Sequence, residues 1–139
     1  MSDVNATVPM RDYFWISLGG ALGTAARYWA SGAVARQFGE TFPWGTLIVN
    51  VSGSLVIGLF AALTGPDGRW LVTPTGRQFF MIGICGGYTT FSSFSLQTLR
   101  LAQEREWLHA GMNIIGSVAL CLAAVWVGHV LGQVINQKR

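Results

Sequence analysis

The sequence predicts an all-α membrane protein, a single domain over residues 1–139 with four transmembrane helices. Its 139 residues are the length of one small domain. Apolar residues make up 51% of the chain and charged residues only 11%, whereas soluble globular proteins carry about 25% charged residues. Four stretches reach the roughly 20 predominantly apolar residues that a helix needs to cross a bilayer. These observations disfavour a soluble protein and exclude a disordered one.

The four predicted spans follow one another with short connections. The first covers about 13–35 and contains one charge, Arg27, whereas the second covers about 44–64 and contains none. The third, about 78–99, and the fourth, about 107–134, are also free of charged residues. Turn-forming or charged residues mark the connections, at Pro43, 65–68, Pro74 and 104–106. Tryptophans stand near the span ends, as in an interfacial aromatic belt: Trp15, Trp29, Trp44, Trp70 and Trp107.

Basic residues are divided almost evenly between the two sides of this four-span arrangement. The side with both termini and the second connection carries five: Arg11, Arg69, Arg77, Lys138 and Arg139. The other side carries three, or four if Arg27 snorkels that way: Arg36, Arg100, Arg105 and Arg27. Because an excess of Lys and Arg sets membrane orientation, this balance predicts insertion both ways up and pairing as an antiparallel dual-topology homodimer. A weakly biased single orientation is the alternative.

Several function classes find no support in the residues. The formal charge of +3 is spread thinly, without the basic cluster that would predict a nucleic-acid partner. Cys85 and Cys121 stand alone in apolar runs, which fits neither a disulfide framework nor zinc-ligand spacing. His109 and His129 lie apart on the fourth span without a nucleophile or metal cluster, so the sequence does not predict an enzyme.

Small and polar residues recur inside the spans. Pairs with the spacing G-x-x-x-G let helix backbones approach closely in lipid, and they predict a compact, oligomeric bundle: Gly19 and Gly23, Gly83 and Gly87, Gly128 and Gly132. Thr46, Asn50 and Ser54 share one helical face, as do Asn113 and Ser117. Hydroxyls such as those of Ser54 and Ser117 can join helices by hydrogen bonds or line a polar path. Asn50 must satisfy two amide donors within an apolar run.

The third span contains the most unusual segment. Two adjacent glycines, Gly86 and Gly87, stand near its middle beside Thr89 and Thr90, and each costs a helix roughly 1 kcal/mol relative to alanine. The pattern predicts either a break there, with freed backbone carbonyls that suit a monovalent cation, or a packing groove lined by small residues.

Aromatic and hydroxyl side chains alternate after these glycines. Phe91 and Phe94 share one face and are interleaved with Ser92, Ser93 and Ser95. Phenylalanines at this spacing are typical of core packing or lipid contact, but the serine hydroxyls do not favour lipid. Hydroxyl hydrogens and electropositive ring edges can both face a negative charge, so this segment also suits a path for a small anion.

Four segments resemble the Fluc (CrcB-type) family of fluoride ion channels. They are GGALGTAARY at 19–28, WGTLIVNVSGSLVIG at 44–58, GICGGYTTFSSFS at 83–95 and the GS pair at 116–117. The resemblance implies antiparallel dual-topology dimers with two pores at their interface, embedded in the bacterial cytoplasmic (inner) membrane as multi-pass proteins. The implied function is passive, fluoride-selective export, which confers fluoride resistance.

The resemblance also implies roles for individual residues. A structural sodium ion at the dimer axis would be held by the backbone carbonyls of Gly86 and Thr89, and the ring edges of Phe91 and Phe94 would meet the permeating fluoride. Asn50 would be an amide donor near the pore. Arg27 would make the vestibule electropositive, or else serve as a snorkelling anchor. The remaining candidates are hydroxyls along the path: Thr46, Ser92, Ser93 and Ser117. Tyr88, Ser93 and Gln97 depart from the residues usual in the family, namely leucine, threonine and glutamate.

Two other functions remain as alternatives. A small dual-topology multidrug exporter that moves cations against protons needs a carboxylate within the membrane. All six acidic residues here fall in tails, connections or span ends: Asp3, Asp12, Glu40, Asp67, Glu104 and Glu106. The other alternative is a non-conducting structural membrane subunit whose polar residues serve assembly alone.

Overall fold

A computed structural model describes residues 8–138, so Asp3 and Arg139 lie outside the described residues. All regular secondary structure between residues 8 and 138 is helical. Two long helices come first, α1 (Met10–Phe38) and α2 (Trp44–Leu63), and α6 (Trp107–Gln137) comes last. Between them lie four shorter segments: α3 (Pro74–Gln78), the π-helix η1 (Phe79–Cys85), α4 (Gly86–Tyr88) and α5 (Phe91–Gln103).

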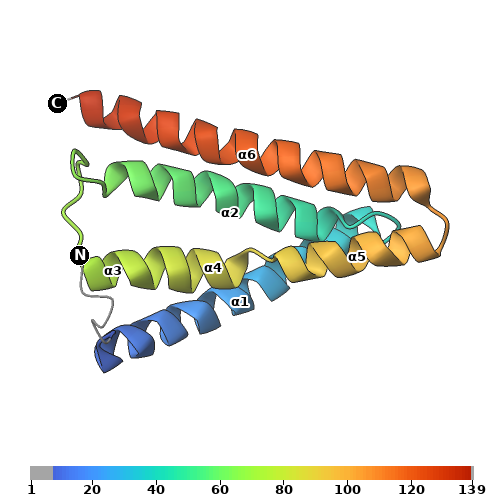
Figure 1. Ribbon diagram of the computed structural model, residues 1–139, viewed down its shortest axis with the longest axis horizontal. Helices are drawn as coiled ribbons and strands as arrows, with labels where there is room; N and C mark the ends of the chain where they lie inside the picture. The colour runs from blue at the N-terminus through green and yellow to red at the C-terminus, as the bar shows by residue number, and fades with distance from the viewer. Residues whose placement is uncertain (1–7, 139) are drawn as a thin grey trace, which may run out of the picture.

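The helices form a bundle in which α1, α2, the run from α3 to α5, and α6 alternate in direction (Figure 1). α2 packs along α6, while α1 packs against η1 and α4. The start of α1, the connection after α2 and the end of α6 lie at one end of the bundle, and the two remaining connections lie at the other (Figure 1). Segments α3 to α5 follow one line across the molecule, with an unwound stretch between α4 and α5.

Three helical stretches are long and apolar enough to cross a membrane. They are Trp44–Leu63, Pro74–Gln103 and Trp107–Gln137, with mean hydropathies of 2.0, 1.2 and 2.2. They contain the second, third and fourth predicted spans. The first predicted span, about 13–35, lies inside α1, which has 29 residues and therefore sufficient length. Because α1 is not among these three apolar stretches, its role as a fourth span stays a prediction.

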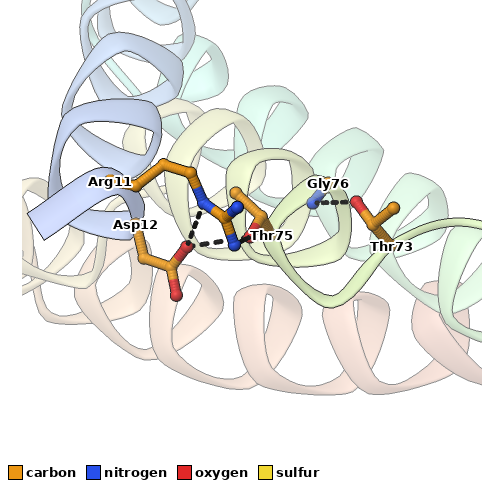
Figure 2. A network of polar contacts seen from close by, with 5 residues as sticks. All are labelled: Arg11, Asp12, Thr73, Thr75 and Gly76. Atoms are coloured by element: carbon orange, nitrogen blue, oxygen red, sulfur yellow. Dashed lines mark hydrogen bonds and ion pairs between the residues drawn. The ribbon is translucent and has the colours of Figure 1, made fainter. Parts of the chain in front are cut away.

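A polar network joins the start of α1 to the start of α3 (Figure 2). Asp12, only 7% exposed, accepts a 2.8 Å hydrogen bond from the Thr75 hydroxyl and lies 3.7 Å from Nε of Arg11. The Arg11 guanidinium also donates to Thr75 Oγ1 at 3.0 Å. Thr73 caps α3 by accepting the N–H of Gly76 at 3.1 Å. Since a buried carboxylate needs partners, this network holds the two helix starts together.

The predicted glycine pairs lie at close helix–helix contacts. A Cβ added to Gly83 of η1 would lie 3.0 Å from the Cα of Gly19 in α1. A Cβ on Gly128 of α6 would collide with the backbone carbonyl of Leu55 in α2. These neighbours are backbone atoms and cannot move aside as a flexible side chain could. The packing role predicted for these glycine pairs is therefore confirmed.

Candidate functional site

The helical run of the third span is interrupted at two threonines. Thr89 and Thr90 are extended, with φ, ψ of −82°, 157° and −152°, 115°, and α5 begins at the next residue. The sequence pattern left open a break at Gly86 and Gly87 or a packing groove of small residues, and both glycines are helical. The reason is packing, because a Cβ on Gly87 would lie 3.0 Å from the Cα of Gly20 in α1. Gly87 thus serves close contact with α1, and the interruption follows the two glycines.

Asn50 of α2 holds the backbone of this interruption. Its Nδ2 donates to the carbonyl oxygen of Thr90 at 3.0 Å, and its Oδ1 accepts the N–H of Thr90 at 2.7 Å. Thr90 is only 8% exposed, and buried backbone groups need partners when a helix is broken at membrane depth. The side chain of Asn50 therefore supplies the acceptor that the Thr90 N–H lacks at the break and an additional donor for the Thr90 carbonyl, a role that the sequence did not suggest.

The same contacts free two carbonyl groups. In a continuous α-helix, the N–H of Thr90 would donate to Gly86 and the N–H of Ser93 to Thr89. Here Thr90 donates to Asn50 instead, and the N–H of Ser93 donates to Thr90 Oγ1 at 3.2 Å. The carbonyl oxygens of Gly86 and Thr89 have therefore lost their helical donors, and they become available to another ligand.

A cavity of about 390 Å³ adjoins the interruption, between α2, η1, α5 and α6. It brings together many of the residues singled out in the sequence: Asn50, Gly86, Thr89, Phe91, Phe94 and Ser117. The two phenylalanine rings lie 5.1 Å apart at an interplanar angle of 49°. Phe94 is 8% exposed, whereas Phe91 is 75% exposed, so the ring pair extends from the core to the surface of the chain.

A second cavity, of about 730 Å³, opens toward the connections at 39–43 and 104–106. Arg27, Thr46 and Ser93 line it, together with charged residues of both signs: Glu40, Arg100, Glu104 and Glu106. Thr90 lines both cavities and therefore lies between them. Ser92 is exposed, with its hydroxyl 3.2 Å from that of Thr90.

Comparison with known proteins assigns the chain to a family. Residues 14–129 match the CrcB-like protein family, described as Camphor Resistance (CrcB). The chain belongs to this family. A relative from Rhodospirillum rubrum is 59% identical over 125 residues, which are 90% of this chain and 97% of the relative. Relatives from Paramagnetospirillum magneticum and Opitutus terrae are also 59% identical, over 92% and 91% of this chain and 100% and 96% of their own lengths. All three are named fluoride-specific ion channel FluC.

Polar side chains in this CrcB-like chain also connect α6 to α5. Asn113, 2% exposed, donates to the Thr98 hydroxyl at 2.9 Å, and the Ser117 hydroxyl donates to Asn113 Oδ1 at 3.3 Å. Ser54, by contrast, donates within its own helix, to the carbonyl of Asn50 at 2.7 Å. Ser117 therefore lines the smaller cavity and also takes part in a hydrogen-bond network between α5 and α6. The two roles that the sequence allowed, lining a polar path and joining helices, are thus compatible.

Two residues of the site were not singled out by the sequence patterns. Thr90 was noted only as a neighbour of the glycines, yet it caps α5 and lines both cavities. Asn113 was noted only for its spacing, yet it anchors α5 to α6. The amide of Asn113 within an apolar run is a usable signal, because its donors must find partners.

Proposed function

We propose that this chain is a fluoride-selective channel of the bacterial cytoplasmic membrane, which exports fluoride passively and so confers fluoride resistance. One observation carries the proposal: a single cavity combines two phenylalanine rings with neutral hydrogen-bond donors, in a family whose relatives are named fluoride-specific ion channels. A channel of this kind moves an ion without making or breaking covalent bonds, so it is not an enzyme.

The chemistry of the cavity suits a small, strongly hydrated anion. Fluoride leaves water only if donors of comparable strength replace its hydration shell. Asn50 has two amide hydrogens, and Thr90 uses only one of them. Ring edges of Phe91 and Phe94 add further electropositive hydrogens. A series of neutral donors lets an ion both enter and leave. Arg27 lines the cavity of about 730 Å³ and not the one that holds the phenylalanine pair. There it would attract anions without holding them beside the rings.

A sodium ion at the interruption fits the residues present. The carbonyl oxygens of Gly86 and Thr89 lack their helical donors, as described above, and hard carbonyl oxygens are suitable ligands for a monovalent cation at a helix break. Bound sodium would supply fixed positive charge and would satisfy both oxygens. The two hydrogen bonds from the Asn50 side chain to the backbone of Thr90, here called the Asn50 clamp, stabilise the unwound segment that carries these carbonyls.

An antiparallel dual-topology homodimer completes the proposal. Phe91 is 75% exposed in the single chain, and Gly86 and Ser92 beside it are exposed as well. Lipid would leave the Gly86 carbonyl and the Ser92 hydroxyl without water as a hydrogen-bond partner. A second copy would cover these groups together with Phe91 and would close the cavity. The near balance of basic residues on the two sides supports insertion in both orientations.

Growth of a bacterium without its own fluoride exporters tests this function. Expression of the chain is expected to restore growth in fluoride-containing medium at acidic pH, where fluoride enters as the weak acid. It should not increase resistance to cationic dyes, because a membrane carboxylate for proton-coupled export is lacking among the described spans. Dye resistance without fluoride resistance would favour the multidrug exporter. Neither form of resistance, with the protein present in the membrane, would favour the structural subunit.

A further inference from the structure

The last helical residue before the interruption, Tyr88, is hydrogen-bonded to α2. Its hydroxyl oxygen lies 3.0 Å from Oγ of Ser52, and Ser52 donates to the carbonyl oxygen of Val49 at 3.1 Å. A serine hydroxyl has a single hydrogen, so Tyr88 is the donor of the pair. Two consecutive hydrogen bonds therefore connect the phenol of α4 to the backbone of α2.

Gly53 allows this close approach of α2 to the interruption. A Cβ at this position would collide with Cγ2 of Thr89 and would lie 3.1 Å from Cδ1 in the Tyr88 ring. Contacts from α2 therefore fix Thr89 and the residues on either side of it. Ser52 holds the residue before it, and Asn50 holds the residue after it.

We propose that Tyr88 and Ser52 are positioning residues that orient the carbonyl oxygen of Thr89 toward the bound cation. Neither side chain lines the two cavities described above, so they act through the backbone of Thr89. The Thr89 hydroxyl is already committed to the carbonyl of Cys85 at 2.9 Å, which leaves the Thr89 carbonyl as the group that this fixation directs. This inference rests on the proposed sodium site of the fluoride channel.

The test is the sodium dependence of fluoride efflux from liposomes, with protein purified in potassium buffer and potassium as the balancing cation. Tyr88→Phe is expected to raise the sodium concentration for half-maximal efflux by about three- to tenfold, the factor that one net hydrogen bond contributes to an equilibrium. Saturating sodium should restore the wild-type rate. Ser52→Ala should give a similar shift, and the double variant little more, because the same bond is lost in each. Tyr13→Phe, at an exposed tyrosine of α1, is the matched control.

The outcomes separate this inference from the proposed function. Fluoride efflux in the wild type, with the same sodium dependence in Tyr88→Phe, would overturn the positioning role alone. A variant whose efflux rate is lower at every sodium concentration, with an unchanged sodium concentration for half-maximal efflux, would also overturn it. That result indicates general structural damage. Absence of fluoride efflux from the wild type at any sodium concentration would overturn the proposed function itself.

Discussion

Asn50→Leu is expected to reduce fluoride efflux from liposomes by about a hundredfold or more. Leucine has a similar volume but neither donates to nor accepts from Thr90, so the Thr90 N–H loses its partner and the Thr90 carbonyl loses the Asn50 donor. Each unsatisfied buried group costs about 1–3 kcal/mol, and the pore loses an amide donor as well. The initial rate of efflux, recorded with a fluoride-selective electrode, measures the effect.

Gln133→Leu provides a matched control for the loss of an amide. Gln133 is exposed on α6 and contacts only His129 among the described polar groups, at 3.0 Å. Its replacement should leave the efflux rate near that of the wild type. Asn50→Asp gives a second comparison, because aspartate keeps the acceptor for the Thr90 N–H but adds negative charge that repels fluoride. Wild-type efflux in Asn50→Leu would contradict the role of the clamp.

Phe91→Ile is expected to reduce efflux by about tenfold or more while leaving the thermal stability of the protein almost unchanged. The 75% exposed ring contributes little to the core of the single chain, so its loss is expected to act on the ion more than on the folding of each copy. Removing about 1.4 kcal/mol of stabilisation at the highest barrier slows a rate tenfold. Efflux and thermal unfolding, measured on the same preparation, separate the two effects.

Phe94→Ile and Phe14→Ile serve as the buried comparison and the exposed control for Phe91→Ile. Phe94 is 8% exposed, so its replacement should lower both efflux and the unfolding temperature. Phe14 on α1 is 64% exposed and lines neither cavity, so its replacement should change neither quantity. If Phe91→Ile conducts like the wild type, the ring edges do not contact the permeating ion.

Hydropathy and glycine spacing predicted much of the fold. The second, third and fourth predicted spans lie in helices that are long and apolar enough to cross a membrane, and the glycine pairs lie at helix contacts. Both signals are local: composition decides whether a helix suits lipid, and spacing decides which residues share a face. The first predicted span contains Arg27 and several glycines and hydroxyl residues, and α1 is not among these apolar helices.

The position of the interruption could not be predicted from helix propensity. Glycine weakens a helix on average, which pointed to Gly86 and Gly87, but the close contact of Gly87 with Gly20 favours a helix there. The partner that stabilises the unwound residues, Asn50, stands 40 residues before Thr90. Periodicity within one helix says nothing about such a contact between two helices, so the amide was predicted near the site but its role was not.

The ratio of fluoride to chloride efflux from liposomes that contain the purified chain tests the central claim most directly. The account predicts rapid efflux of fluoride, negligible efflux of chloride, and no requirement for a proton gradient. The neutral donors around Asn50 and the phenylalanine pair would then be a pathway selective for the smaller ion. Equal efflux of the two halides, or efflux of neither, would contradict it.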